Sequence, residues 1–136
     1  MSKPLAVPPD AERVIVDFLT AALAARSQDV TVGVDLPTTW TTTTKPHVQV
    51  ALDGTPSVTY PILWRASVRV TAWASAPTAV KALAALCEGL LLSHSGSVQV
   101  ASVQSLTGVL PTRDPDTGAQ LASVSVRVNL RGTVLA

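Results

Sequence analysis

The side chains best suited to acid–base or nucleophilic chemistry are two histidines and a single cysteine. His47 stands at the start of a candidate strand and His94 follows a candidate helix, but neither accompanies a serine-nucleophile motif or a pair of carboxylates. Cys87 lies on an apolar helical stripe, where cysteine behaves as a small hydrophobic residue. No His or Arg stands one helical turn away to lower the pKa of its thiol. We therefore expect no enzyme activity.

The sequence also lacks the usual motifs for binding metal ions or phosphate groups. Asp114 and Asp116 have the spacing that starts a calcium-binding loop, which needs Gly at its sixth position and Glu at its twelfth. Those positions hold Ala119 and Ser125. The seven glycines form no phosphate-binding motif, and one cysteine with two distant histidines cannot build a structural zinc site. The sequence therefore predicts neither a metal nor a cofactor.

Composition favours one small domain that associates with other protein chains. A chain of 136 residues buries roughly two-thirds of its unfolded surface as one domain. Its net charge of +1 provides no general attraction for nucleic acid or an anionic membrane. Only 14% of the residues are charged, against about 25% in ordinary soluble domains, which favours an oligomer. No apolar run has the length of a signal peptide or a spanning helix, so we expect use without export.

The element that must position the other segments is a strand over residues 62–75. Its even residues, from Ile62 to Ala74, are apolar, and its odd residues are largely polar, so the sheet has one apolar and one polar face. Helical periodicity predicts two covering helices, one over about residues 9–26 and one opened by Ala76-Pro77. Further strands are expected over 30–34, 47–52, 97–109 and 121–131, the third with a bulge near 101–103.

These elements predict the fold class α+β: an antiparallel-rich sheet of four to five strands with two helices packed on one face. The whole chain, residues 1–136, is expected to be a single domain. Its predicted core places strand residues under helical ones: Trp64, Val68 and Val70 under Phe18, Leu19, Leu83 and Cys87.

The second helix is apolar nearly all round, which is typical of a helix buried on more than one side. Leu86 and Leu92 lie away from its main stripe. We expect the first helix or another subunit to cover at least one of them, and both are candidate subunit contacts.

Two loops, residues 36–46 and 111–119, and an extended lead over residues 1–8 lack the apolar pattern of core elements. The first loop carries Trp40 and Lys45, and the second carries Arg113, Asp114 and Asp116. All five are candidate subunit or partner contacts, because loops on a rigid sheet often carry recognition. For Trp40 two interpretations stay open: packing onto its own domain, or contact with a partner. We expect both loops to be mobile or extended in the free subunit, and Trp40→Ala to spare the fold.

Four arginines, Arg65, Arg69, Arg127 and Arg131, can share the polar face of the sheet. Three interpretations are open for this face. It can be an ordinary solvated surface, it can form ion pairs across subunits, or it can touch DNA phosphates.

The run QLASVSVRVNLRG over residues 120–132, preceded by the turn-rich PTRDPDTG of residues 111–118, resembles tail terminator proteins of long-tailed (siphovirus-type) bacteriophages, especially those that infect actinobacteria. The order of elements is similar over nearly the whole chain. It includes a long strand with a Trp-containing end, Val70-Thr-Ala-Trp73, followed by an Ala/Leu-rich helix. The Thr38–Thr44 run matches no feature of that family.

The resemblance implies a structural virion protein that forms a homohexameric ring on the end of the tail tube and stops tube polymerisation. Its implied partners are other copies of itself, the tail tube protein and the head–tail connector protein, with DNA only as passing cargo and no membrane. The implied location is the tail end at the head–tail junction of the virion, after assembly in the host cytoplasm. Two alternatives stay open: another connector, head-closure or tail-completion protein, and a small ligand-binding or hydrolytic domain.

Overall fold

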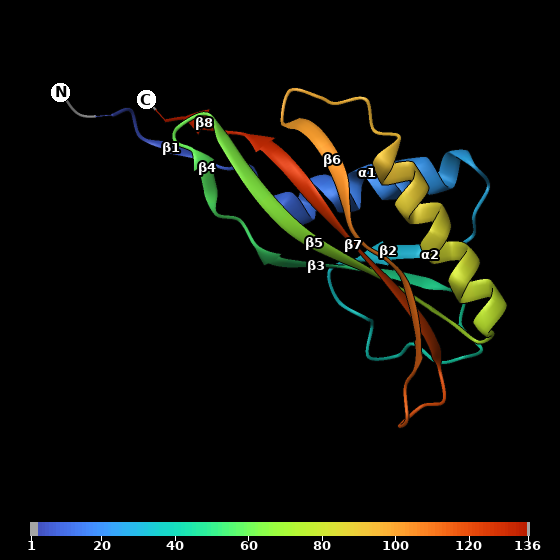
Figure 1. Cartoon of the computed structure of the whole chain (residues 1–136). Coiled ribbons are helices and arrows are strands. Elements are labelled where there is room, and N and C mark those ends of the chain that lie inside the picture. Colours follow the sequence, from blue (N-terminus) through green and yellow to red (C-terminus); the bar gives the residue numbers. More distant parts are fainter. Residues whose placement is uncertain (1–2, 136) are drawn as a thin grey trace.

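The computed structural model describes residues 3–135 and shows an α+β fold with two helices and a mostly antiparallel sheet (Figure 1). The sheet has six strands, in the order β2-β3-β5-β7-β6, with β4 pairing with one end of β5. A second sheet consists of β1 and β8. The elements are β1 (Ala6–Val7), α1 (Ala11–Ala25), β2 (Thr31–Gly33), β3 (His47–Gly54), β4 (Ser57–Thr59), β5 (Leu63–Ala74), α2 (Pro77–Leu92), β6 (Val100–Arg113), β7 (Gln120–Arg131) and β8 (Thr133–Val134).

The central strand is β5, as its alternating pattern predicts. It lies between β3 and β7 and pairs with β7 without interruption, from Leu63 opposite Arg131 to Ala74 opposite Gln120. Every even residue from Trp64 to Ala74 is buried. The prediction that Ile62 belongs to this apolar face is wrong, because the Ile62 N–H donates to the Thr59 carbonyl in a turn and the side chain is 66% exposed.

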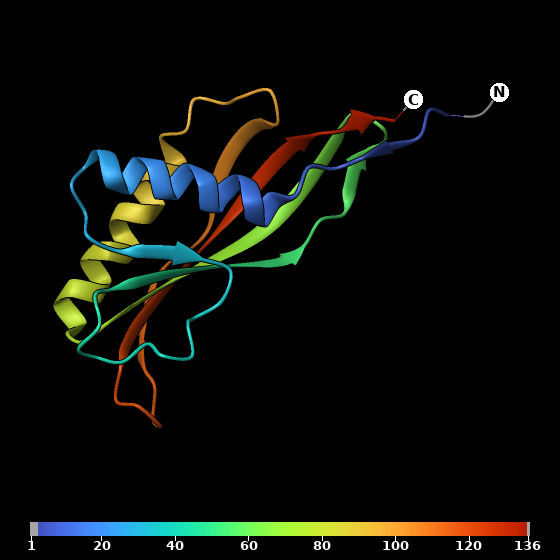
Figure 2. The same cartoon turned by 180° about the vertical axis from the view of Figure 1, so that it is seen from behind.

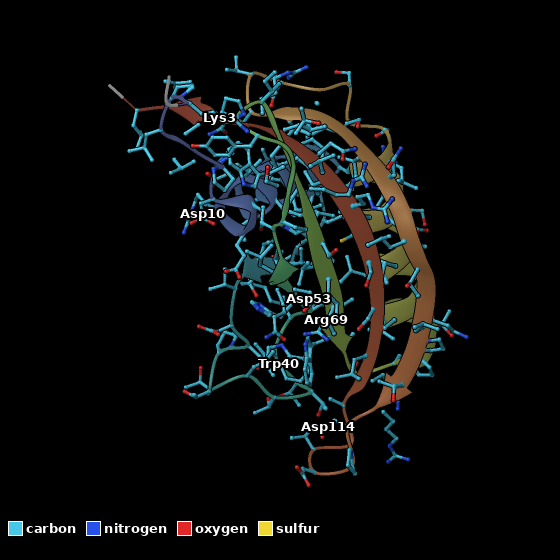
Figure 3. All side chains as sticks on the ribbon, turned by 60° about the vertical axis from the view of Figure 1, so that its left-hand side comes forward. Lys3, Asp10, Trp40, Asp53, Arg69 and Asp114 are labelled. Atoms are coloured by element: carbon cyan, nitrogen blue, oxygen red, sulfur yellow. The ribbon has the colours of Figure 1, made fainter. Side chains whose placement is uncertain are left out.

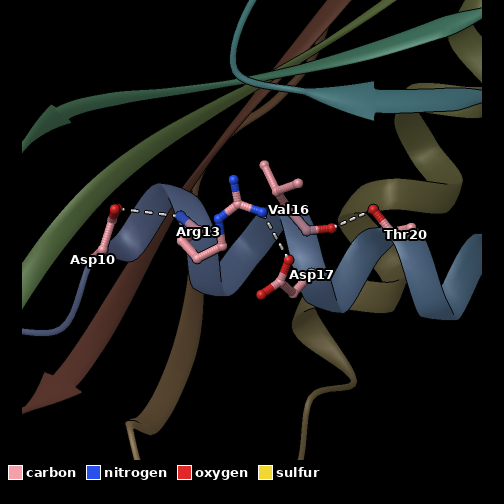
Figure 4. Close-up of polar contacts among 5 residues, drawn as sticks. All are labelled: Asp10, Arg13, Val16, Asp17 and Thr20. Atoms are coloured by element: carbon pink, nitrogen blue, oxygen red, sulfur yellow. Dashed lines mark hydrogen bonds and ion pairs between the residues drawn. The ribbon is translucent and has the colours of Figure 1, made fainter.

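Helix α1 begins at a polar cap. Asp10 Oδ1 accepts a hydrogen bond from the backbone N–H of Arg13 at 3.2 Å, an arrangement that contributes about 1 kcal/mol to helix stability (Figure 4). The next turns carry an exposed Arg13–Asp17 ion pair at 3.3 Å and a Thr20 hydroxyl that donates to the Val16 carbonyl. The opposite face is apolar and buries Ile15, Leu19 and Leu23. This face packs against β2, β3 and β5.

Helix α2 covers the other half of the same sheet face. It packs against β5, β6 and β7, and its buried stripe is Val80, Leu83, Ala84, Cys87 and Leu91. Pro77 occupies its first turn, where a missing N–H costs nothing, as predicted. The two helices and the even residues of β5 and β7 form one buried cluster. The predicted core is confirmed, with Phe18 only partly buried at its border.

The strand count and several boundaries differ from the sequence-based expectation. The prediction of four to five strands missed β4, whose three residues are all exposed and carry no alternating pattern. Residues Pro111–Arg113 belong to β6, so the loop expected over 111–119 is reduced to residues 114–119. The expected bulge near residues 101–103 is confirmed by a register shift between Val100 and Ser102.

The pairing of β1 with β8 was also not anticipated. It ties Ala6 to Val134 and Val7 to Thr133, so part of the extended lead predicted over residues 1–8 is a short strand. Residues 1–2 of that lead lie outside the described residues. In Figures 1 and 2 this small sheet and β4 lie together at one end of the molecule, away from α2.

Candidate interaction surfaces

Of the two histidines, His47 is buried and joins separate segments of the fold, whereas His94 packs against Phe18 and accepts a hydrogen bond from the Gly96 N–H. The His47 side chain has Nε2 2.9 Å from the Asp35 carbonyl oxygen and Nδ1 2.6 Å from Thr31 Oγ1. Because a carbonyl can only accept, Nε2 donates and Nδ1 accepts from the threonine hydroxyl. Burial lowers the pKa of His47, an effect only partly opposed by the hydrogen bond to Asp35. The neutral imidazole thus joins β2, β3 and the segment that follows β2.

Cys87 is buried beneath α2, and desolvation raises the pKa of its thiol to about 12. The thiol therefore stays protonated at neutral pH. Among residues 3–135, no three His, Cys, Asp or Glu side chains gather as metal ligands do.

The loop over residues 34–46 folds back onto its own domain through Trp40. The Trp40 side chain is only 8% exposed, and its ring meets Trp73 edge-on at 5.9 Å between centroids. Its Nε1 donates to the Lys45 carbonyl at 3.0 Å, and the Lys45 ammonium lies 3.3 Å from Asp29 Oδ1. Of the two interpretations of Trp40, the structure shows packing against the parent domain. The expectation that Trp40→Ala spares the fold is therefore replaced by an expected loss of stability.

The sheet face that the helices leave uncovered carries the predicted arginines. Arg65 Nε donates to Asn129 Oδ1 at 3.2 Å. The Arg69 guanidinium lies 3.6 Å from the Asp53 carboxylate, and Figure 3 shows Arg69 and Asp53 close together. Arg127 stands on β7 opposite Ser67, between Arg65 and Arg69 along the strand direction. We call Arg65, Arg69 and Arg127 the arginine face.

Arg131 has a different environment from the other three. Its guanidinium donates to the carbonyls of Ser97 and Val100, and its backbone N–H donates to the Gln99 carbonyl. It therefore anchors the segment that leads into β6.

Beside Arg69 a shallow groove of about 260 Å³ runs across β3, β5 and β7, lined by Gln49, Ala51, Arg69, Thr71, Trp73, Leu121 and Ser123.

The hairpin between β6 and β7 ends in a tight polar turn, which we call the acidic tip (residues 114–118). The Asp114 carboxylate accepts from the Thr117 hydroxyl at 2.6 Å and from the Asp116 N–H at 3.2 Å, and these bonds lower the pKa of Asp114. Gly118, which closes the turn, has φ of +72°, a backbone conformation that glycine adopts without strain. Arg113 pairs with Gln120 at the base of the tip. In Figure 3 Asp114 lies at the far end of the hairpin, beyond the rest of the sheet.

The two leucines of α2 have different surroundings. Leu86 is partly buried against the core and lines a groove of about 350 Å³ with Gln28, Val30, Pro46, Ala79, Ala82 and Leu83. Leu92 is 41% exposed at the end of the helix. The protein's own core therefore covers Leu86 only in part, and both leucines stay candidate subunit contacts.

A further surface was not predicted from the sequence: a cluster of exposed apolar side chains around β1, β4 and β8, which we call the apolar end. Its members come from separate segments: Leu5, Val58, Ile62, Val134 and Leu135. Beside them lies an apolar groove of about 500 Å³, lined by Thr59, Pro61, Ile62, Leu63, Ala101, Arg131, Gly132 and Val134. No periodic pattern marks this surface, since its residues are brought together only by β1–β8 pairing and the turn before β5.

Tyr60 positions the apolar end on the core. Its hydroxyl donates to the Pro4 carbonyl at 2.8 Å and accepts from the Ala6 N–H at 3.1 Å, while its ring meets Trp64 edge-on at 5.7 Å. Two hydrogen bonds therefore join the N-terminal segment around β1 to Tyr60, and strand pairing joins the same segment to β8.

No protein-family model matches the chain, and a search of curated proteins finds no significant match. No helix within residues 3–135 has both the length and the apolar character needed to span a membrane.

Proposed function

We propose that this protein is a tail terminator of a long-tailed bacteriophage, a non-enzymatic subunit that forms a ring on the end of the tail tube. The ring stops tube polymerisation and provides the attachment surface for the head connector. The proposal rests on the sequence resemblance over residues 111–132 and on surfaces suited to protein–protein contact. It places the protein at the head–tail junction of the virion, with DNA passing through.

The observation that carries the proposal is the apolar end. Ile62, Val134 and Leu5 are 66%, 59% and 63% exposed, and backbone pairing brings their segments together. Exposed apolar side chains that gather at one end of a protein are typical of interaction sites. Only 14% of the residues are charged, so the subunit has few charged side chains to keep these apolar side chains in solution. A closed head-to-tail ring would cover this surface by joining it to a different patch of the next copy.

The free edge of β6 gives independent support for protein contacts. Among the described residues β6 pairs only with β7, so its second edge presents unpaired backbone groups. The strand has no charged residue from Val100 to Thr112, and Leu106 and Leu110 are exposed on it. Charged side chains usually protect such edges from pairing with other chains, and here they are missing.

The experiment combines mass measurement with a tube-polymerisation assay. Light scattering after gel filtration should give six times the 14.1 kDa subunit mass, alone or after mixing with the tail tube protein. Electron microscopy should show rings, and adding the protein to polymerising tube protein should shorten the tubes.

A matched pair of variants tests the apolar end. Ile62→Asp should reduce ring formation. Val34→Asp introduces the same charge at an exposed valine that follows β2, away from the apolar end, and should leave ring formation unchanged. A protein that stays monomeric with tube protein present, and leaves tube length unchanged, would refute the proposal. Binding to the connector without binding to the tube would favour the head-closure alternative.

A further inference from the structure

The arginine face carries positive charge that the subunit itself does not neutralise. Arg65 is held by an amide oxygen, and within residues 3–135 neither Arg65 nor Arg127 forms an ion pair. Asp53, 3.6 Å from Arg69, is the one carboxylate paired with this face. Cross-strand register places Arg127 on β7 opposite Ser67, so it lies beside the midpoint between Arg65 and Arg69, which stand roughly 13 Å apart along β5. The three arginines therefore form a triangle across two adjacent strands.

The acidic tip has the opposite character. Asp116 is exposed and Asp114 is partly exposed, and the hydrogen bonds from the Thr117 hydroxyl and the Asp116 N–H lower the pKa of Asp114. The Asp116 carboxylate has no hydrogen-bond or ion-pair partner in the described part of the chain. Arg113 at the base leaves the segment 113–118 with a net charge of −1. Because the hairpin projects past the other strands, its tip is free to reach a neighbouring molecule (Figure 1).

We propose that the acidic tip of one copy docks on the arginine face of the next copy, in a head-to-tail contact. The inference rests on the proposed ring and names a contact within it. Two different patches of one chain meet in such a heterologous interface, and complementary charges fix their register. The groove beside Arg69 gives the tip a place to seat.

A second copy fits this face better than a DNA duplex does. The chain as a whole has a charge of only +1, so it has no general field that attracts a polyanion. A copy of the same chain supplies a compact acidic segment of opposite charge to the arginine face, on which Arg65 and Arg127 form no ion pair within residues 3–135.

The test is a charge swap. Arg127→Glu and Asp116→Lys should each weaken self-association by about tenfold at about 50 mM salt, and the effect should shrink at about 500 mM. The double variant Arg127→Glu/Asp116→Lys should recover affinity to within about threefold of the unchanged protein, because the pair is restored with reversed sign. Lys81→Glu, a charge reversal on the exposed side of α2, is the matched control and should have no effect. Sedimentation velocity measures the association, and circular dichroism checks that each variant folds.

The outcomes separate this contact from the proposed function. If the single variants form rings like the unchanged protein, or if the double variant is no better than the singles, the contact is overturned while the ring stands. The contact is also overturned if Arg127→Glu lowers retention of duplex DNA but leaves self-association unchanged. If the unchanged protein never forms a ring, even with tube protein, the proposed function fails and this contact fails with it. Arg127→Gln provides a milder variant if Arg127→Glu does not fold, and it should show the same direction of change.

Discussion

Gly132, between β7 and β8, is a position where a single added methyl group should strongly destabilise the fold. Its N–H donates to the Ile62 carbonyl at 2.9 Å, which holds the chain close to the turn before β5. A Cβ at this position would overlap the ring of Trp64 and the carbonyl oxygen of Pro61. Neither can move easily, because the Trp64 ring is buried against Tyr60 and the Pro61 oxygen belongs to the backbone.

The expected cost of Gly132→Ala follows from this fixed environment. Overpacking a well-packed site usually costs about 1–3 kcal/mol. Because neither neighbour can move easily, we expect Gly132→Ala to lower the free energy of unfolding by about 3 kcal/mol. With a urea dependence of about 2 kcal/mol per molar, the unfolding midpoint should fall by about 1.5 M. The measurement is urea unfolding followed by far-UV circular dichroism, at one protein concentration because association contributes to stability.

Gly108→Ala is the matched control for this experiment. A Cβ on Gly108 in β6 meets nothing within 4 Å, so the variant should stay within about 0.5 kcal/mol of the unchanged protein. If Gly132→Ala unfolds at the same urea concentration as Gly108→Ala, the close approach of Gly132 to Trp64 and Pro61 is wrong.

Three further predictions concern the core, the loop and pH. Val68→Asp places an unpaired charge at a fully buried position and should cost more than about 4 kcal/mol, seen as loss of soluble protein, whereas Ser67→Asp on the opposite face should stay soluble. Trp40→Ala should lower the free energy of unfolding by about 3 kcal/mol, because it removes a buried ring from Trp73; a urea midpoint equal to that of the unchanged protein would show that the loop contributes nothing. Burial lowers the pKa of His47, so the folded state binds fewer protons than the unfolded state. Its contribution to stability is complete above about pH 6.5 and is lost as the pH falls below that value toward the lower folded pKa. The urea midpoint should therefore drop between about pH 7.5 and about pH 5, and His47→Gln should show a smaller drop.

Periodicity found the elements whose pattern is local. The alternation of β5 predicted which of its residues face the core, and helical periodicity predicted that Leu83 and Cys87 of α2 are buried. Short elements without such a pattern were missed. β4 has three exposed residues, and β1 and β8 have two residues each, so their existence depends on pairing with segments distant in the sequence.

The candidate site shows the same division. The sequence indicated that the arginines can share a polar face, and it predicted a mobile or extended loop where residues 114–118 form a hydrogen-bonded turn. It left open whether Trp40 contacts its own domain or a partner. The answer depends on Trp73, which lies in β5 and meets Trp40 only after the loop folds back. The extension of β6 through Arg113 likewise depends on pairing with Gln120 across the hairpin, which overrides the turn character of Pro111.

By itself, the sequence determined the two-faced central strand and the covering helices, because each depends on residues within a few positions of one another. Only the tertiary structure decided the apolar end, the order of charges on the arginine face and the close approach of Gly132 to Trp64. Each of these joins side chains from strands far apart in the chain, and pairing register, which no single segment encodes, determines which of them meet.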